Sequence, residues 1–358
     1  MADPRVLIIG AGLVGSSLGL ALTRNGCDVV LSDQVGSHAV VAAGLGAGRV
    51  GLPAADEVDI VVVATPPAVI ARVVADALHR FPTAVVTDVG SVKGTIIDDV
   101  QVLAPNLAAR YVPSHPMAGS QYTGPLTASA DLFVDRTWVV TPGPMNTDEH
   151  VQQVVDLAER TGAHVVIMPA EQHDVAVAQV SHVPHLMSIL TASHLRAVPG
   201  ENIALAGQGI RDVTRIAGSD PGLWQQIISA NADAIRGELD EVAEDLRYLL
   251  GVLDKPEKLE QFLGLGQAGA KALLVKHGAE PIDVHEVTVE IPDEPRALAR
   301  LFTDIGDAGL NVEDFELRHD PVRQVGYLTI SVEHERAEQF RDTLEQQGWV
   351  AASAARKG

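Results

Sequence analysis

The side chains in this sequence that are best suited to acid–base chemistry are histidines in short polar segments. His115 is followed by Pro-Met-Ala-Gly-Ser and Gln121, and a second segment, Ser-His-Val-Pro-His, contains His182 and His185. A neutral imidazole can accept the proton of a hydroxyl group near pH 7, which makes these residues candidate general bases. Each histidine taken alone is more often structural than catalytic, so the segments carry weight only in combination.

A third segment contains two arginines four residues apart, Arg211 and Arg215, and Trp224 follows shortly after them. A guanidinium group presents a planar fork of donors that matches a carboxylate. The chain carries 26 basic and 47 acidic side chains, a formal net charge of −21. A small anionic substrate must therefore be held by a local cluster of this kind, and the same charge argues against binding to nucleic acid or to an anionic membrane.

Paired histidines three residues apart also raise the question of a metal site. A transition-metal site normally adds a third Cys, Asp or Glu ligand at a recognisable spacing, and we find none for His182 and His185. We therefore expect no metal.

Near the N-terminus, a glycine-rich segment predicts a dinucleotide site. It reads Gly-Ala-Gly-Leu-Val-Gly between a strand-like run and a helical one, a context that lets pyrophosphate approach the free N–H groups of a helix N-terminus. The residues assigned to the cofactor here are Gly10, Gly12, Leu13, Val14 and Gly15. Asp33, 23 residues after Gly10, stands where a carboxylate can bind both ribose hydroxyls and would repel a 2′-phosphate. The predicted cofactor is NAD rather than NADP.

Two further loops are expected at the same edge of the sheet. Thr65 and Pro66 follow an apolar run, and Ser91 lies in the loop after the next run. Ligands bind at the carboxyl ends of the strands in open α/β folds. We therefore assign Thr65, Pro66 and Ser91 to the cofactor-binding edge.

Strand-like and helical stretches alternate from residue 5 to about residue 170. The apolar runs are continuous in Val and Ile, as expected of buried parallel strands. They lie at 6–9, 28–31, 60–64, 84–87, 138–141 and 164–168. This alternation predicts a doubly wound parallel sheet, a Rossmann domain over residues 1–172.

The uncharged stretch from 6 to 22 resembles a signal peptide or membrane span in composition. Four glycines interrupt it, and no small-residue cleavage site follows. The single cysteine, Cys27, excludes an internal disulfide and fits a reducing compartment. We expect a cytoplasmic protein without a membrane segment.

From residue 171 the strand signal stops, and helical patterns continue to about residue 278, which predicts an all-helical domain over residues 173–280. The clearest pattern is an apolar stripe at spacings of three and four on an otherwise acidic helix. Its members are Leu239, Val242, Leu246, Leu249 and Leu253. The stripe fits a core helix within one chain or a helix that packs against a second subunit.

The tail, residues 281–358, returns to mixed structure. Apolar and polar residues alternate from 286 to 291, and a helical pattern, two strand-like runs, a second helical pattern and a start of a strand at Trp349 follow. The predicted order is βαββαβ, a ferredoxin-like unit.

Taken together and in order, the motifs resemble the prephenate and arogenate dehydrogenase family over roughly residues 5 to 260, and the tail resembles an ACT regulatory domain. The resemblance implies a homodimer formed through the helical domain. It also implies an NAD-dependent oxidative decarboxylation of prephenate, in which C4 loses hydride to NAD, the ring carboxylate leaves as carbon dioxide and aromatisation drives the reaction. Tyrosine, the end product, is the implied effector of the tail.

The resemblance also assigns roles. His115 would accept the proton of the 4-hydroxyl, and Ser91 would orient His115 and the nicotinamide. The substrate-binding residues would be Arg215, Arg211, His182, His185, Gln121 and Trp224. Trp224 matches a position that completes a neighbouring subunit's pocket, and the sequence leaves open which of His182 and His185 faces the ligand.

Two departures from the family pattern bear on specificity. Some members carry an acidic residue at the position of Gln121, where it can pair with the ammonium group of arogenate, so neutral Gln121 favours prephenate and arogenate remains the alternative. In the tail, Arg296 stands where many ligand-binding ACT domains have Gly, whose missing side chain lets an amino acid approach the backbone. Arg296 therefore weakens the expectation that the tail binds tyrosine.

Two other classes share features of this layout. The β-hydroxyacid dehydrogenases also join a Rossmann domain to a helical one, but they use a lysine base in a glycine-rich helical segment, and the corresponding region from 206 to 209 has none. A non-catalytic sensor of NAD and an amino acid is the second alternative, which an assay for NADH production separates from an enzyme.

Overall fold

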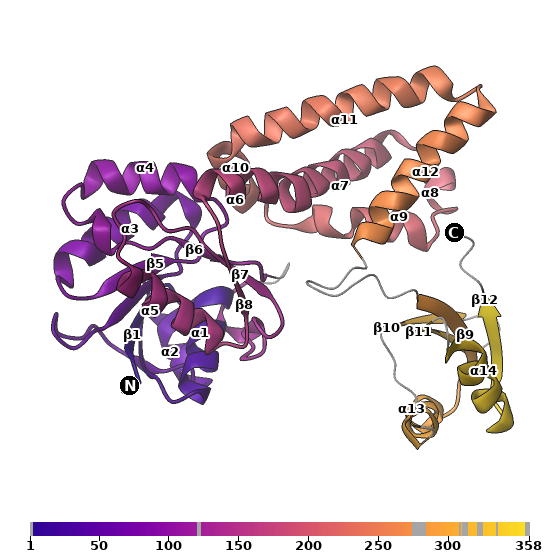
Figure 1. Ribbon diagram of the computed structural model, residues 1–358, viewed down its shortest axis with the longest axis horizontal. Helices are drawn as coiled ribbons and strands as arrows, with labels where there is room; N and C mark the ends of the chain where they lie inside the picture. Colours follow the sequence, from indigo (N-terminus) through magenta and orange to yellow (C-terminus); the bar gives the residue numbers. More distant parts are fainter. Residues whose placement is uncertain are drawn as a thin grey trace. The chain divides into compact units, whose positions relative to one another are not determined.

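The computed structural model describes residues 3–119, 123–273, 284–307, 309, 314–320, 325–333 and 336–354. The chain divides into two units, Met1–Arg247 and Tyr248–Gly358. The first unit begins with an α/β segment, from Arg5 to Ile167. The helices from Ala170 to Ala272 form the helical segment, and the second unit ends in a small α/β tail (Figure 1). The predicted boundaries at 172 and 280 stay predictions.

A five-stranded parallel sheet forms the centre of the α/β segment, in the order β3-β2-β1-β4-β5. Its strands are β1 (Arg5–Ile9), β2 (Asp28–Ser32), β3 (Arg49–Val50), β4 (Ile60–Val63) and β5 (Val85–Asp88). The strand order reverses between β1 and β4, and the loops that leave the carboxyl ends of these strands meet there. In open α/β sheets such a switch point is where ligands bind.

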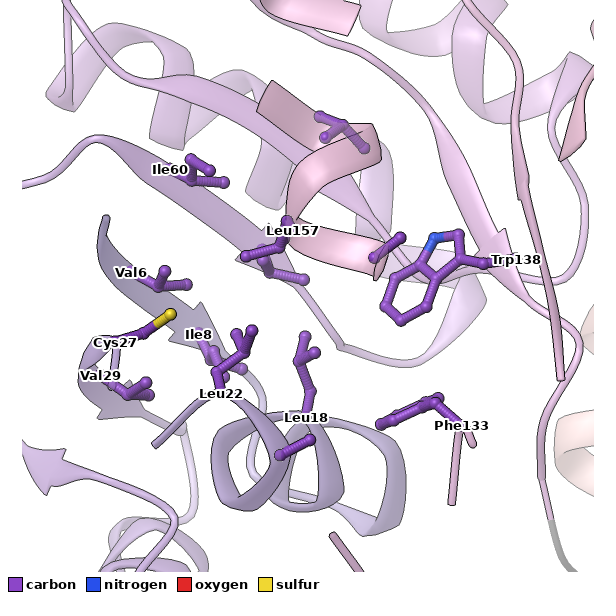
Figure 2. Packing of buried hydrophobic residues seen from close by; sticks show 14 of the residues in the cluster. Val6, Ile8, Leu18, Leu22, Cys27, Val29, Ile60, Phe133, Trp138 and Leu157 are labelled. Atoms are coloured by element: carbon purple, nitrogen blue, oxygen red, sulfur yellow. The ribbon is translucent and has the colours of Figure 1, made fainter. Parts of the chain in front are cut away.

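Helices cover both faces of this sheet because successive side chains of each strand point to opposite sides. On one face Val6 and Ile8 pack with α1 (Leu13–Arg24), α2 (Gly36–Gly44) and α5 (Asp148–Glu159). On the other face Leu7 packs with α3 (Pro67–Arg80) and α4 (Gly94–Leu103). Figure 2 shows Leu18 and Leu22 of α1 in the same apolar space as Val6 and Ile8. The stretch from 6 to 22 is thus a buried strand, turn and helix.

A second, three-stranded sheet extends the α/β segment in the order β6-β7-β8. Its strands are β6 (Ser114–Pro116), β7 (Thr137–Val140) and β8 (His164–Ile167), and the short helices η1 (Ala108–Arg110) and η2 (Pro125–Thr127) lie in the connections. β6 runs antiparallel to β7. The prediction of one parallel sheet was wrong in this respect. The sequence gives no apolar run at β6, because only three residues pair and they read Ser-His-Pro.

Helices follow from residue 170, as predicted. They are α6 (Ala170–Val177), the π-helical turn η3 (Ala178–His182), α7 (Val183–His194), η4 (Leu195–Ala197), α8 (Gly200–Ile203), α9 (Gln208–Thr214), η5 (Arg215–Gly218), α10 (Pro221–Ala230), α11 (Ala232–Val252) and α12 (Pro256–Ala272). Local chemistry explains the start of α10, where Asp220 accepts a hydrogen bond from the Leu223 N–H at 2.7 Å and Pro221 occupies the first helical position.

The apolar stripe of α11 is only partly buried within one chain. At its start Leu239 and Val242 pack against a small core of Ala178, Val183 and Ile235. Farther along, Leu246 and Leu253 are 54% and 58% exposed. The helix itself is confirmed, and the stripe offers an uncovered apolar surface.

The tail has the predicted order βαββαβ. Its elements are β9 (Val284–Pro292), α13 (Ala297–Asp307), β10 (Asp314–Asp320), β11 (Val325–Glu333), α14 (Ala337–Gln346) and β12 (Val350–Ala354). The strands form an antiparallel sheet in the order β10-β11-β9-β12, whose core includes Val289, Leu328 and Phe340. Arg296, just before α13, has a φ of 75°, a conformation that glycine adopts more easily than arginine.

Candidate active site

His115 lies on β6 and contacts a histidine that the sequence analysis did not single out. Its Nδ1 atom is 2.9 Å from Nε2 of His173, which belongs to α6, and the two rings meet edge to face. His115 forms no hydrogen bond through Nε2 with the part of the chain that the structure describes. One ring nitrogen is therefore held in place and the other is available to a ligand.

Asp174 anchors this pair of histidines. Its Oδ1 atom is 2.8 Å from Nδ1 of His173 and 2.9 Å from the N–H of Lys93, and its Oδ2 atom accepts the N–H of Gly94 at 2.7 Å. Burial opposes ionisation of Asp174, but the hydrogen bonds from His173, Gly94 and Lys93 outweigh it and lower the pKa of the carboxyl. The result is a carboxylate that joins α6 to the start of α4.

A buried ion pair lies beneath this network. Lys93 is fully buried, and its ammonium group donates to the Asp88 carboxylate and, at 2.6 Å, to the carbonyl oxygen of Ser114. Tyr111 donates its hydroxyl to the other oxygen of Asp88 at 2.8 Å. Burial lowers the pKa of Lys93, and Asp88 opposes that effect. Since Ser114 precedes His115, the ion pair fixes the strand that carries the candidate base.

Electrostatics keep His115 neutral. Burial is the largest cause, and His173, Lys93 and His182 add to it, so the pKa of His115 lies well below its usual value of 6.5. Near neutral pH the side chain is therefore an unprotonated imidazole, the form that a general base requires.

His182 and His185 both lie buried beside Trp224. The ring of His185 stacks on the Trp224 indole with centroids 3.4 Å apart, and His182 meets the same indole edge-on at 6.1 Å. Asn231 donates to Nδ1 of His182 at 3.2 Å and to the carbonyl oxygen of Asp174. The donated bond leaves the proton of neutral His182 on Nε2. Trp224, expected to serve a neighbouring subunit, thus also contacts two histidines of its own chain.

The two arginines lie on a segment that packs against α7. Ser188 of α7 donates to the carbonyl oxygen of Val213 at 2.7 Å, which ties this segment down. Arg211 and Arg215 are exposed and form no ion pair with the residues that the structure describes. Their guanidinium groups are free to bind an anion.

The predicted site also includes Gln121 and Ser91. Gln121 lies outside the described residues, so its role stays a prediction. Ser91 is half-buried in the loop between β5 and α4. Its hydroxyl has no hydrogen bond within the described parts of the chain, and its predicted role in orienting His115 stays a prediction.

The glycine-rich turn matches what a dinucleotide needs. Gly10 has a φ of 108°, and a Cβ there would collide with the carbonyl of Ala64, whereas a Cβ on Gly12 would meet nothing within 4 Å. The backbone at Gly12 is therefore open to a ligand, and α1 begins there without a side-chain cap or an acidic residue in its first turn.

Two side chains at the same edge complete the cofactor site. Asp33 accepts hydrogen bonds from the N–H groups of Ala11 at 2.6 Å and Val35 at 2.7 Å, which holds its carboxylate beside the turn. The buried hydroxyl of Thr65 has no hydrogen-bond partner within the described chain. An unpartnered buried hydroxyl is costly unless a ligand completes it, so the residues present fit NAD.

Sequence reasoning missed His173, Asp174 and Asn231. A signal was available, because an adjacent His-Asp pair lies on the helix that follows the last strand of the α/β segment. Their partnership with His115 is not visible in the sequence, since 58 residues separate the two histidines. No cluster of three or more His, Cys, Asp or Glu side chains that could hold a metal occurs in the described ranges.

Comparison with known proteins adds independent findings. A family model described as "Prephenate dehydrogenase, nucleotide-binding domain" matches residues 18–167, and a second, "Prephenate dehydrogenase, dimerization domain", matches residues 169–264. The chain is 32% identical over 361 residues to a probable prephenate dehydrogenase, NovF, of Streptomyces niveus. That match covers 97% of this chain and 99% of the relative, so it includes the tail.

Two solved structures are similar over about three quarters of the chain. Prephenate dehydrogenase from A. aeolicus in complex with hydroxyphenyl propionate and NAD+ gives a TM-score of 0.70 at 25% identity, covering 76% of this chain and 99% of that one. Synechocystis arogenate dehydrogenase gives a TM-score of 0.66 at 25% identity, with 75% and 99% covered.

Proposed function

The chain belongs to the prephenate dehydrogenase family, and we propose that it catalyses the NAD-dependent oxidative decarboxylation of prephenate to 4-hydroxyphenylpyruvate in tyrosine biosynthesis. The observation that carries the proposal is the network around His115. A neutral imidazole, bonded through Nδ1 to His173, follows Ser114, whose hydroxyl donates to the carbonyl oxygen of Asp88 at the carboxyl end of β5, in a domain whose glycine-rich turn fits NAD. Such a group suits removal of the proton from the substrate's 4-hydroxyl.

His115 takes up the proton of the 4-hydroxyl as the C4–H bond breaks. NAD, when bound, supplies the acceptor for the hydride from C4. Loss of carbon dioxide then returns an electron pair to the ring, and the proton on His115 returns to the oxygen of the new phenol. The reaction releases no net proton, so a single buried imidazole is sufficient as both proton acceptor and proton donor.

Substrate binding is assigned to cationic and aromatic side chains of the helical segment. Arg215 and Arg211 bind the carboxylates, and His182 donates a hydrogen bond from Nε2. Trp224 supplies an aromatic surface next to the ring. Ser91 and Thr65 bind the cofactor from the loops after β5 and β4, together with the turn from Gly10 to Gly15.

Prephenate is preferred to arogenate because Gln121 offers no negative charge to the ammonium group of arogenate. The test is direct. Purified full-length protein with NAD and prephenate should produce NADH and 4-hydroxyphenylpyruvate, and arogenate should give a lower kcat/KM. Failure to oxidise either compound would refute the function, and higher activity with arogenate would reverse the substrate.

The active form is a homodimer built through the helical segment. Two observations support this assembly. The apolar stripe is exposed at Leu246 of α11 and at Leu253 just after the helix, and residues 169–264 match a dimerization domain. A second subunit would cover the stripe and bring further side chains to the arginines.

The tail is assigned as an ACT domain that binds tyrosine. Its βαββαβ order supports the fold. Arg296 has a positive φ, a backbone conformation that glycine adopts easily. This supports the assignment of its loop to the position where ligand-binding ACT domains have Gly. Inhibition by tyrosine that persists unchanged after removal of residues 281–358 would contradict this role.

The enzyme is assigned to the cytoplasm. Among the described residues one helical stretch, Ala170–Ala197, is long and apolar enough to cross a membrane by length and composition alone. This stretch contains the buried side chains of His173, His182 and His185, which contact the α/β segment or Trp224. Those contacts favour a core helix of the active site.

A further inference from the structure

The side chains of His173 and Asp174 belong to neither the cofactor turn nor the arginine segment, yet they are joined directly to His115. We propose that they are positioning residues that fix the ring orientation and the tautomer of His115, leaving its Nε2 atom unprotonated and available to the substrate hydroxyl. The purpose of this arrangement rests on the proposed function. The tautomer itself is a property of the protein and can be measured without a substrate.

The tautomer of His115 can be derived step by step, starting from the Asp174 carboxylate. An ionised carboxylate only accepts hydrogen bonds, so Nδ1 of His173, 2.8 Å away, carries a proton. With one proton on each imidazole of the pair, His173 has its lone pair on Nε2. His115 Nδ1 lies 2.9 Å from that atom and must be the donor. The remaining nitrogen of His115 is therefore the acceptor.

The same chain of groups holds the ring of His115 during proton transfer. When His115 receives a proton at Nε2, its Nδ1 atom still donates to His173, so the orientation of the ring is kept. A carboxylate that orients a histidine base is known from hydrolases. Here a second imidazole stands between the carboxylate and the base.

The arrangement also joins two segments of the chain. His115 comes from β6 of the α/β segment, whereas His173 and Asp174 open the helical segment on α6. Asp174 additionally holds the N–H groups of Lys93 and Gly94, directly after the loop with Ser91. Substitution of Asp174 would therefore disturb the backbone of α4, and His173 is the sharper residue to test.

Two substitutions of His173 in the full-length enzyme separate positioning from packing. His173→Leu removes the acceptor for His115 and should lower kcat about tenfold to a hundredfold, with KM for prephenate and NAD within about threefold. His173→Gln retains a side-chain oxygen that can accept from Nδ1, and it should recover activity to within about fivefold of wild type. The matched control is His164→Leu, since His164 forms a solvent-exposed pair with Asp135 at 3.6 Å and should leave kcat unchanged.

Non-additivity gives a stricter readout. If His173 acts only through His115, then His173→Leu should cause no further loss of kcat in a His115→Asn background. Multiplicative losses in the double variant, or equal losses for the Leu and Gln variants, would assign His173 a general structural role and overturn the proposal.

The tautomer provides a readout that does not depend on activity. In nitrogen-15 spectra of histidine-labelled protein near pH 7, the signals absent from His115→Asn identify His115, and they should show a protonated Nδ1 and an unprotonated Nε2. The opposite tautomer would overturn the proposal whatever the substrate is. An enzyme inactive on prephenate and arogenate would instead refute the proposed function and leave this measurement intact.

Discussion

The α/β segment and the helical segment differ in how completely one chain buries its own apolar side chains. In the first, both faces of the sheet are covered, and Ile8 and Trp138 are fully buried. In the second, a small core forms around Ile235, but Leu246 and Leu250 of α11 remain 54% and 64% exposed. A single chain therefore covers the apolar side chains of the first segment, whereas the second leaves an apolar surface exposed, a feature typical of interaction sites.

The functional groups follow the same division. His115 and its hydrogen-bonded neighbours are buried and fixed in advance, as a catalytic base should be. Arg211 and Arg215 are exposed and unpaired in the parts of the chain that the structure describes. The proposed base is thus held in place within one chain, while the arginines that we propose to bind substrate are exposed.

The largest effect is expected from a substitution of the buried candidate base, His115. His115→Asn removes the proton acceptor and should lower kcat by about a hundredfold or more, while NAD affinity stays within about twofold because the glycine-rich turn is untouched. Steady-state rates measure kcat, and NAD titration measures the affinity for the cofactor. A variant within threefold of wild-type kcat would remove His115 from its catalytic role.

Lowering the pH should reduce the stability of the protein through His182, which lies in the helical segment. Burial lowers the pKa of His182 to about 4, from 6.5 in the unfolded chain. Between these values the unfolded state binds more protons, so stability is lost as the pH falls from about 6.5 towards 4. The loss is on the order of 2 kcal/mol, since each pKa unit corresponds to about 1.4 kcal/mol and relaxation reduces the full value.

Denaturant unfolding at several pH values checks this effect. His182→Asn should show a smaller loss of stability between pH 7 and pH 4.5 than wild type, whatever its stability at pH 7. His164→Asn provides the control, because it removes a solvent-exposed histidine and leaves the surroundings of His182 unchanged. Identical pH dependence in all three proteins would show that His182 does not titrate differently on unfolding.

Leu246→Asp tests whether the exposed stripe is covered in the assembled enzyme. A carboxylate buried against a second subunit should favour monomers and lower activity about tenfold or more at micromolar concentration, because charges are costly to desolvate. Sedimentation and rate measurements give both. Val102→Asp on α4 is the matched control, since Val102 is 80% exposed on the self-contained α/β segment. Equal behaviour of the two variants would contradict the proposed dimer.

The smallest expected effect concerns the tail. Arg296→Gly should relieve a backbone φ of 75° and stabilise the local structure by about 0.5 to 1 kcal/mol. The amides of β9 and α13 in the full-length protein should then exchange about twofold to fivefold more slowly with deuterium. Faster exchange would mean that the arginine side chain stabilises the loop more than its backbone conformation destabilises it.

Most of the fold was accessible from local patterns. Continuous Val and Ile runs predicted the strands β1, β2, β4, β5, β7 and β8 within one or two residues, and the alternation after residue 286 predicted the tail sheet. Such patterns work because strand and helix periodicities reflect which side chains are buried. The prediction failed at β3 and β6, where two or three residues pair without an apolar run.

The sequence by itself determined the family, the cofactor class and the acid–base candidate His115, because those depend on residue types in short contiguous motifs. Only the tertiary structure decided which groups hold that candidate. His173 and Asp174 contact His115 and the start of α4 across 58 and about 80 residues of chain, and no local pattern encodes a hydrogen bond between segments so far apart. Tertiary folding also decided that this histidine is neutral, because its pKa depends on burial and on the neighbouring His173, Lys93 and His182, which come from distant parts of the chain.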